Sequence, residues 1–432
     1  MTHTTNPTSS ARSAPKSMPS ICVLGLGYIG LPTASLLATK GFQVYGMDVN
    51  QEIVDNLNQG KVLIQEPSLD IMVKSAVNSG NLKASHEPEP ADIFIIAVPT
   101  PFKENHEPDL TYVLESASAL ASKLETGCLV ILESTSPVGT TEQVAATIAQ
   151  QRPDLCISQR CLTNKSFSDQ PVFVAHCPER VLPGQILREL VENDRIVGGI
   201  DSASTQKARE FYELFVSGKV LTTDSRTAEM AKLVENAFRD VNIAFANELS
   251  LICDHMDINV WDMISLANHH PRVNILQPGP GVGGHCIAVD PWFIIHNNPD
   301  LTSLMRTARQ VNEQKPEYVV QKITDKSKRF KKPVIACLGL SYKPNVDDLR
   351  ESPALEIVRK LSTFNDAEIL VVEPNIPDLP QDLNGSVQLS TLEQAIENSD
   401  IMASLVGHKE FKEMNPAMLK DKIVLDFVNV FS

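Results

Sequence analysis

One segment of the chain places a cysteine among glycines. Residues 279–292 read GPGVGGHCIAVDPW, with four glycines in the first six positions, Cys286 shortly after them and Asp290 four residues further on. A cysteine can act as a nucleophile, and glycines leave the backbone bare, so that a ligand can approach the sulfur closely. The alternative is a structural cysteine, which behaves as a small buried apolar residue. The segment therefore predicts a nucleophile if the rest of the chain supplies a ligand.

A second set of polar residues shares one side of a predicted helix. The segment TAEMAKLVENAFRDVNIAFANELSLICDHM has a helical pattern and contains no proline. Lys232, Asn236 and Arg239 are spaced four and three residues apart, which puts them on one helix face. A polar face of this kind can bind a ligand, or it can be a solvated stripe, and spacing alone favours the solvated stripe.

A nucleotide site is predicted near the N-terminus. ICVLGLGYIGLPTASLLATKGFQVYGMDVN reads as a buried strand, a turn through Gly25, Gly27 and Gly30, a helix and a second strand that ends at Asp48. The G-x-G-x-x-G pattern alone could be an ordinary tight turn. Here it follows a strand, opens a helix and precedes an acid 18 residues after Gly30, so it predicts a dinucleotide at the helix N-terminus. Asp48 would bond the ribose 2′-hydroxyl, which favours NAD over NADP.

The fold class expected is α/β. Strands in ADIFIIAVPTP and GCLVILESTSPVGTT would end near the cofactor and bring Thr100 and Thr135 there, although either threonine could be only a helix cap. Further strands are expected in PVIACLGLSYKP, AEILVVEP, DIMASLVG and KIVLDFVNV. We therefore predict a flexible tail at 1–19, an N-terminal Rossmann-type domain at 20–222, a central helical segment at 223–328 and a C-terminal Rossmann-like α/β domain at 329–432.

Composition excludes several classes of partner. The 432 residues include 38 Lys plus Arg against 53 Asp plus Glu, a formal charge of −15, so nucleic acid and anionic membranes are not expected to bind. No apolar run approaches the ~20 residues of a membrane helix. The eight cysteines form no CxxC pair, which is typical of a reducing compartment and predicts a soluble, cytoplasmic protein.

A series of motifs along residues 20–430 resembles the nucleotide-sugar 6-dehydrogenases related to UDP-glucose dehydrogenase. In order they are GLGYIGLP, VPTP, ESTSPVGTT, CPERVLPG, AEMAKLVENAFRDVNIAFANE, GVGGHCIAVDP and YKPNVDDLRESPA. The resemblance implies an NAD-dependent, four-electron oxidation of a UDP-sugar at C6, through a cysteine thiohemiacetal and thioester. CPERVLPGQ, HPRVNILQPGPGVGGHCIAVDPWF and VVEPN are similar to the branch that oxidises UDP-N-acetyl-D-mannosamine, a precursor for surface polysaccharide, and Pro183 stands where the UDP-glucose branch typically has a glutamate.

The resemblance also implies roles for individual residues. Cys286 would be the nucleophile and Lys232 a proton shuttle or a stabiliser of charge on the substrate oxygen. The catalytic residues it implies are Cys286, Lys232, Asp290, Thr135 and Glu179. The cofactor-binding residues are Gly25, Gly27, Tyr28, Ile29, Gly30, Asp48, Thr100 and Thr135. The substrate-binding residues are Arg180, Val181, Lys232, Asn236, Arg239, His270, Arg272, Gly283, Tyr342, Lys343 and Arg350.

Within that set, His270 and Arg272 match residues that the family supplies from a neighbouring subunit. A homodimer or a higher homo-oligomer with a shared substrate site is therefore expected. No metal is expected at the His269–His270 pair, because no third ligand stands at a recognisable spacing. Tyr342, Lys343 and Arg350 match contacts to uridine diphosphate. The chain departs from the family at Val428, where relatives have a basic residue, so one phosphate or sugar contact is missing from the expected set.

Three alternatives stay open at this point. The same reaction could act on UDP-N-acetylglucosamine or on UDP-glucose, because residue spacing does not predict which configuration of a sugar carbon the pocket accepts. The chain could also be a two-electron NAD-dependent reductase. Finally, it could be a non-catalytic NAD-binding module in which Cys286 is structural.

Overall fold

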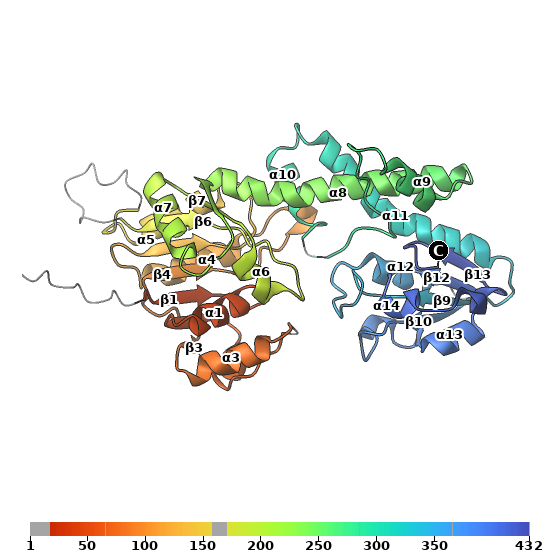
Figure 1. Ribbon diagram of the computed structural model, residues 1–432, viewed down its shortest axis with the longest axis horizontal. Coiled ribbons are helices and arrows are strands. Elements are labelled where there is room, and N and C mark those ends of the chain that lie inside the picture. Colours follow the sequence, from red (N-terminus) through yellow and green to blue (C-terminus); the bar gives the residue numbers. More distant parts are fainter. Residues whose placement is uncertain (1–17, 65, 158–170, 285, 365, 432) are drawn as a thin grey trace, which may run out of the picture. The chain divides into compact units, whose positions relative to one another are not determined.

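The computed structural model describes residues 18–64, 66–157, 171–284, 286–364 and 366–431. Residues 1–17 of the predicted tail and Cys161 lie outside the described residues. The chain forms two compact units, which we call the N-terminal unit (Met1–Pro101 with Asp109–Met230) and the C-terminal unit (Phe102–Pro108 with Ala231–Ser432). Each unit contains a sheet with helices on both faces (Figure 1).

The described part of the N-terminal unit contains an eight-stranded sheet in the order β3-β2-β1-β4-β5-β6-β7-β8. Its neighbouring strands are parallel except for β6 and β7, which pair antiparallel. The strands are β1 (Ile21–Leu24), β2 (Val44–Met47), β3 (Leu82–Ser85), β4 (Ile93–Ile96), β5 (Leu129–Leu132), β6 (Phe173–His176), β7 (Arg195–Gly199) and β8 (Val220–Asp224).

Helices bury both faces of this sheet, which explains why its strands are continuous apolar runs. Ile21 and Val23 of β1 face one apolar cluster, whereas Cys22 and Leu24 face the other. The first cluster is completed by α1 (Gly30–Thr39), α3 (Leu69–Asn78), α6 (Ile186–Glu192) and α7 (Ser202–Tyr212), and the second by α4 (Thr111–Ala121) and α5 (Thr140–Gln151). A short helix, α2 (Gln51–Asn58), follows β2.

The described part of the C-terminal unit contains a five-stranded parallel sheet in the order β11-β10-β9-β12-β13. The strands are β9 (Val334–Leu338), β10 (Glu368–Val372), β11 (Gln388–Leu389), β12 (Ile401–Ser404) and β13 (Ile423–Asp426). One face packs against α11 (Ser303–Ser327) and α12 (Pro353–Leu361), and the other against α13 (Leu392–Asn398) and α14 (Lys409–Lys412). The α/β class and the two Rossmann-type sheets are confirmed.

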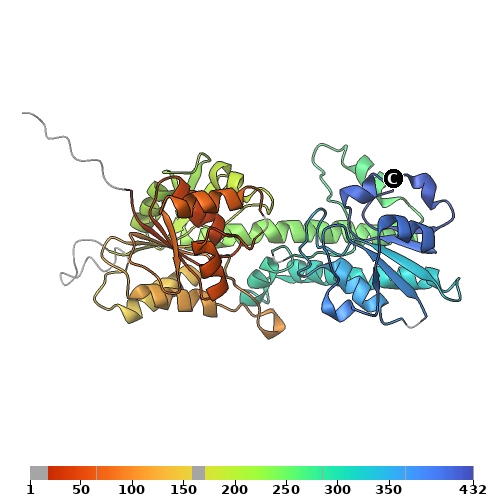
Figure 2. The ribbon, with the colours of Figure 1, turned by 90° about the horizontal axis from the view of Figure 1, so that it is seen from below.

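The predicted long helix is α8 (Ser225–His255), which runs unbroken for 31 residues (Figure 2). Within the C-terminal unit it is joined to α11 by buried polar groups. Arg309 of α11 pairs with Asp240 at 2.7 Å, and Asn312 donates to Asp240 Oδ1 at 2.8 Å. Asn247 lies about two turns further along α8 and donates to Asn312 Oδ1 at 2.9 Å. Part of the polar pattern of this helix therefore faces protein rather than solvent.

The remaining elements of the C-terminal unit are short. They are α9 (Val260–Ala267), α10 (Asp290–Asn297) and the 3-10 turns η1 (Glu104–His106), η3 (Gln381–Leu383) and η4 (Pro416–Leu419). The segment with η1 belongs to this unit because its aromatic side chains contact α10: Phe102 packs edge-on against Phe293, and His106 stacks on Trp292 at 4.1 Å between ring centroids. No helix in the described ranges is long and apolar enough to cross a membrane.

Candidate active site

The glycine turn after β1 has the geometry of a phosphate-binding loop. Gly25 has φ of +91°, and a Cβ on Gly30 would lie 1.8 Å from the Gly25 carbonyl oxygen, so neither position admits a side chain. Gly27 differs, because apart from its chain neighbours no described atom lies within 4 Å of a Cβ built there. Helix α1 begins at Gly30, and among the described residues no side chain caps it at Ile29. The bare N-terminus beside Gly27 fits the pyrophosphate of a dinucleotide.

Asp48 lies beside this turn, at the end of β2. Its Oδ2 accepts the backbone N–H of Leu26 at 2.9 Å, and its Oδ1 accepts that of Asn50 at 2.9 Å. Each carboxylate oxygen retains a second lone pair for a ribose hydroxyl. Tyr28, also assigned to the cofactor, is 40% exposed at the same turn.

We expect NAD to be preferred over NADP by at least ~10-fold in kcat/KM, because the Asp48 carboxylate would repel a 2′-phosphate. The residues that follow it, Val49, Asn50 and Gln51, contain no arginine to offset that repulsion. Steady-state kinetics with both cofactors measures the ratio. Equal kcat/KM values would mean that Asp48 does not meet the ribose.

Two further predicted cofactor residues come together at neighbouring strand ends. Thr100 follows β4 and Thr135 follows β5, and the Thr100 hydroxyl donates to the Thr135 carbonyl oxygen at 2.6 Å. Both residues are half-buried. They lie at the carboxyl ends of parallel strands, where open α/β sheets bind ligands.

The CPER turn after β6 carries a buried charge network. The Glu179 carboxylate pairs with Arg195 at 2.8 Å, with side chains 7% and 2% exposed, and accepts the Arg180 N–H at 2.5 Å. A second carboxylate, Glu133, accepts the Tyr212 hydroxyl at 2.7 Å, and burial with the nearby charge of Glu179 raises the pKa of Glu133 to about 7. Glu179 thus has a structural partner inside the N-terminal unit, and its catalytic role stays a prediction.

The two predicted substrate residues of the same turn differ in environment. Arg180 is half-buried and donates from its guanidinium to the Asp194 carbonyl oxygen at 3.3 Å. Val181 packs against the apolar cluster that includes Ile186 and Leu190. Substrate binding by either residue stays a prediction.

In the C-terminal unit, the thiol segment is built into the start of α10. The Cys286 carbonyl oxygen accepts the N–H of Asp290 at 2.8 Å and that of Val289 at 3.1 Å. This turn places the Asp290 carboxylate in the first turn of α10, where the helix dipole favours a negative charge. The spacing of four residues between Cys286 and Asp290 is therefore that of one helical turn.

Cys286, Asp290, Lys232 and Asn236 form one cluster, although Lys232 and Asn236 come from α8, Asp290 from α10 and Cys286 from the turn before α10. Asn236 of α8 is buried and donates from Nδ2 to Asp290 Oδ2 at 2.5 Å. Burial raises the pKa of Asp290 to about 6, and the positive charge of Lys232 and this hydrogen bond oppose the rise. Burial and the charge of Asp290 raise the pKa of Cys286 to about 11, and Lys232, Arg350 and Arg239 oppose that shift. Asn236 therefore contacts Asp290, and the charges of Lys232 and Arg239 act on the thiol, although Arg239 itself is exposed.

This environment predicts a pH-dependent thiol. With a pKa of about 11, the thiolate fraction of Cys286 and its alkylation rate by iodoacetamide should rise roughly tenfold per pH unit between about pH 7 and 9. Asp290→Asn removes a negative charge, so it should lower the pKa of Cys286 and speed alkylation at pH 8. Mass spectrometry of the Cys286 peptide measures both rates, with the fully buried Cys337 as internal control. A rate independent of pH would mean that the thiolate is already formed.

The glycines before Cys286 are explained differently from the expectation. A Cβ on Gly283 would lie 2.2 Å from the Glu351 carbonyl oxygen, and one on Gly284 would lie 2.8 Å from the ring of Tyr342. These glycines let the thiol segment pack closely against the loops of its own unit. The bare backbone at these two positions is required by protein contacts, and the predicted contact of Gly283 with substrate stays untested.

The loops after β9 carry the residues assigned to uridine diphosphate. Lys343 Nζ lies 5.6 Å from the centroid of the Tyr342 ring. Arg350 is 51% exposed at its side chain and pairs with Asp348 at 2.6 Å. The sheet order reverses between β9 and β12, and ligands of open α/β sheets bind at such a point.

His270 and Arg272 lie in the exposed turn after α9. The Arg272 N–H donates to His270 Nδ1 at 3.3 Å, which orders the turn locally. Their predicted action on a neighbouring subunit's substrate needs such an exposed position. Across the described ranges, no group of three or more His, Cys, Asp or Glu residues is arranged to hold a metal ion.

At the departure from the family pattern, Val428 packs against an apolar cluster that includes Ala336 and Leu338. Asp426, two residues earlier, accepts the Ser404 hydroxyl at 2.6 Å and the N–H groups of Val430 and Phe431 at 2.8 and 2.9 Å. The aspartate folds the C-terminal turn, and the side chain at 428 contributes to the core instead of carrying a charge.

Sequence reasoning missed the buried residues Glu373 and His408, which contact the loop of Tyr342 and Lys343. VVEPN and LVGHKEF each follow a strand, and this is the only signal that could have found them. Their partners in that loop lie 32 to 67 residues away in sequence, so no local pattern pairs them with it.

Three family models match the chain in sequence. They are the NAD binding domain, central domain and UDP binding domain of the UDP-glucose/GDP-mannose dehydrogenase family, at residues 19–216, 226–314 and 336–432. A UDP-N-acetyl-D-mannosamine dehydrogenase of Campylobacter jejuni is 58% identical over 407 residues, which are 94% of this chain and 98% of that protein. An NDP-N-acetyl-D-galactosaminuronic acid dehydrogenase of Ralstonia solanacearum is 55% identical over 412 residues, 95% of this chain and 96% of that protein. Among solved structures, a UDP-D-ManNAc dehydrogenase from Pyrococcus horikoshii has a TM-score of 0.83 at 37% identity and covers 96% of both chains.

Proposed function

Since the chain belongs to the UDP-glucose/GDP-mannose dehydrogenase family, it is an NAD-dependent UDP-sugar dehydrogenase, and we propose that its substrate is UDP-N-acetyl-D-mannosamine. The product would be UDP-N-acetyl-D-mannosaminuronate, formed by a four-electron oxidation at C6. The observation that carries the substrate is the 58% identity to the Campylobacter jejuni protein. The covalent oxidation rests on the cluster of Cys286, Lys232 and Asp290, in which a thiol, a cation and a carboxylate act on one another's charge.

The glycine turn and Asp48 fit NAD, which when bound accepts the hydride in each of the two oxidations. In the first oxidation the substrate alcohol gives up a hydride and releases its hydroxyl proton to solvent to become an aldehyde, and the ammonium of Lys232 would stabilise negative charge on the substrate oxygen. The Cys286 sulfur then adds to the aldehyde carbon, and its proton passes by way of Asp290 to the aldehyde oxygen, which gives a neutral thiohemiacetal. The second oxidation leaves a thioester, and water cleaves the carbon–sulfur bond to give the acid and restore the thiol.

The ionisation states support this order of events. Asp290, with a pKa of about 6, is mostly ionised at neutral pH and can accept a proton. Cys286, with a pKa of about 11, is a thiol at neutral pH. We further propose that Glu179 and Thr135 take part in thioester hydrolysis, and that Asn236 and Arg239 contact the sugar.

The test is to incubate the purified protein with NAD and a panel of UDP-sugars and to measure NADH and acid product. The proposal requires two NADH per sugar, whereas a two-electron reductase would form one and a binding module none. UDP-N-acetyl-D-mannosamine should give the highest kcat/KM of the panel.

A second candidate substrate is an N-acetylgalactosamine nucleotide, because the Ralstonia relative, named for N-acetyl-D-galactosaminuronic acid, is 55% identical to the chain. UDP-N-acetylglucosamine and UDP-glucose complete the panel. Since these sugars differ in the direction of single substituents, the ranking of kcat/KM within the panel identifies the substrate.

We also propose a homodimer in which His270 and Arg272 complete the partner's substrate site. Large apolar side chains on α8 are exposed at positions separated by one or two turns: Val234, Phe238, Phe245, Ile252 and Met256. Phe238 is 69% exposed and Phe245 50%, and an apolar stripe of this kind marks an interface. A solution mass of a single chain, 47.4 kDa, would contradict the dimer.

We place the protein in the cytoplasm. No disulfide joins the seven cysteines that the structure describes, and six of them are buried. Thiols in this number are typical of a reducing compartment.

A further inference from the structure

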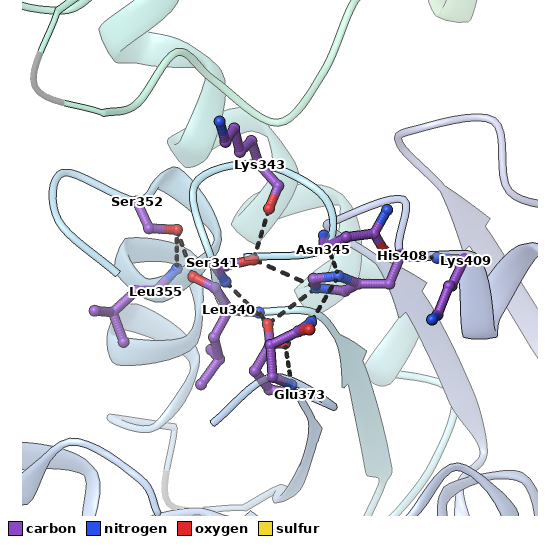
Figure 3. Close-up of polar contacts among 10 residues, drawn as sticks. Leu340, Ser341, Lys343, Asn345, Ser352, Leu355, Glu373, His408 and Lys409 are labelled. Atoms are coloured by element: carbon purple, nitrogen blue, oxygen red, sulfur yellow. Dashed lines mark hydrogen bonds and ion pairs between the residues drawn. The ribbon is translucent and has the colours of Figure 1, made fainter. Parts of the chain in front are cut away.

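A buried carboxylate–imidazole pair lies against the loop that carries Tyr342 and Lys343 (Figure 3). Glu373 follows β10 and His408 follows β12, and the side chains of both are 0% exposed. Glu373 Oε2 lies 3.1 Å from His408 Nε2. Neither side chain can touch a ligand from this position. Both stand at carboxyl ends of strands, close to the point where the sheet order reverses.

The pair binds the backbone of residues 340–345 at both ends of this loop. Glu373 Oε2 accepts the N–H of Leu340 at 2.7 Å and that of Ser341 at 3.0 Å. His408 Nδ1 accepts the N–H of Asn345 at 2.9 Å, and Asn345 has φ of 61°, in the left-handed region that non-glycine residues seldom adopt. The loop therefore holds a conformation that its own residues do not favour, and the pair supplies the bonds that compensate.

The middle of the loop is oriented by the same arrangement. The Ser341 hydroxyl donates to the Lys343 carbonyl oxygen at 2.8 Å, and its oxygen lies 3.4 Å from His408 Nε2. In Figure 3 the Lys343 side chain points away from the pair while its carbonyl points toward Ser341. The ammonium is thus presented on the side of the loop opposite to the buried network.

The groups around the side chain of residue 373 are all hydrogen-bond donors, so this position requires an ionised carboxylate. Because His408 Nδ1 accepts from Asn345, a neutral imidazole carries its proton on Nε2 and donates it to Glu373. The Glu373 oxygens also accept from Leu340, Ser341 and both nitrogens of Asn375, so every neighbour is a donor. Burial opposes ionisation, but the hydrogen bonds from His408 and Leu340 hold the pKa of Glu373 at about 2, so it is charged at neutral pH.

We propose that Glu373 and His408 are positioning residues for the uridine diphosphate. They hold the loop of Tyr342 and Lys343 in its binding conformation before the ligand arrives, so that binding does not have to order this loop. The role rests on the proposed function, because it assumes that this loop meets the nucleotide. It concerns affinity for the uridine diphosphate and no chemical step.

The experiment compares His408→Leu with His408→Gln in the full-length protein, with UDP as the probe. Leucine makes neither hydrogen bond, whereas a glutamine side chain can accept from Asn345 through its oxygen and donate to Glu373 through its nitrogen. His408→Leu should weaken UDP binding and raise the KM for the sugar nucleotide roughly 10-fold, with the KM for NAD unchanged. His408→Gln should recover most of the affinity. Calorimetry with UDP and steady-state kinetics measure these changes.

A matched control is Ile396→Ala in α13, a buried residue of the same domain outside the loop network. It should lower the melting temperature and leave UDP affinity unchanged. Equal weakening by Ile396→Ala and His408→Leu would overturn the positioning role, because the effect would then be general destabilisation. Unchanged UDP affinity in His408→Leu would overturn it as well. If the unaltered protein did not bind UDP, the proposed function itself would fall, and the positioning role with it.

Amide hydrogen exchange tests the role without any variant. In the unaltered protein without UDP, the peptide that covers residues 339–346 should exchange slowly, because the N–H groups of Leu340, Ser341 and Asn345 are already bonded. Fast exchange that slows only after UDP is added would overturn the proposal, because the ligand and not the pair would then order the loop.

Discussion

Replacing Cys286 by serine should abolish formation of the acid while leaving binding of both nucleotides intact. A serine hydroxyl is a weak nucleophile at neutral pH unless a strong base activates it, and here the nearby carboxylate of Asp290 has a pKa of only about 6. In a single turnover, the variant should form at most one NADH per sugar. The loss of acid product should be at least ~10³-fold, since a covalent step is removed outright.

The control for this experiment is Cys253→Ala, which removes a thiol that is 5% exposed on α8 and has no part in the proposed chemistry. It should keep two NADH per sugar. If Cys286→Ser also released two NADH at the parent rate, the covalent mechanism would be wrong, and Cys286 would be structural.

Replacing Lys232 by alanine should lower kcat by a factor of ~10² to 10⁴, as for other positioned acid–base groups. The reason is that its charge acts directly on the cluster: it lowers the pKa values of both Cys286 and Asp290 against the effect of burial. Lys232→Arg should not restore activity, because a guanidinium stays protonated and its planar fork is larger than an ammonium. The KM for NAD should change little, because the proposed contact is with the reacting oxygen of the sugar.

Lys332→Ala supplies the matched comparison, since it removes an exposed lysine from the same unit. Lys332→Ala should leave both kcat and the melting temperature unchanged. A near-parent kcat for Lys232→Ala, with the melting curve unchanged, would remove Lys232 from the mechanism.

Local sequence patterns predicted the parts of this molecule that depend on neighbours in the chain. The turn through Gly25 and Gly30 could be predicted because it combines a strand, close backbone approach and a helix start within ten residues. Helix α8 could be predicted because its helical pattern of apolar and polar residues continues over eight turns. Cys286 and Asp290 belong together because one helical turn separates them.

The parts that could not be predicted depend on contacts across the sheet or between helices. Asp240 looks like one more polar residue of α8, but Arg309, 69 residues later, makes it a buried ion-pair partner. Glycines 283 and 284 look like an opening for a ligand, but they accommodate Glu351 and Tyr342. Glu373 and His408 are joined across two strand ends, and no spacing in the sequence reports that contact.

Helix α8 has a consequence for how the sequence can evolve. It carries Lys232 and Asn236 toward the thiol, Asp240 and Asn247 toward α11, and Phe238 and Phe245 toward solvent. Each residue added to an α-helix rotates everything after it by about 100° and advances it by about 1.5 Å. A single insertion between Asn236 and Asp240 would turn the buried aspartate away from Arg309 while Lys232 and Asn236 kept their place. Descendants of this gene should therefore vary α8 by substitution and change length only in the loops at its two ends.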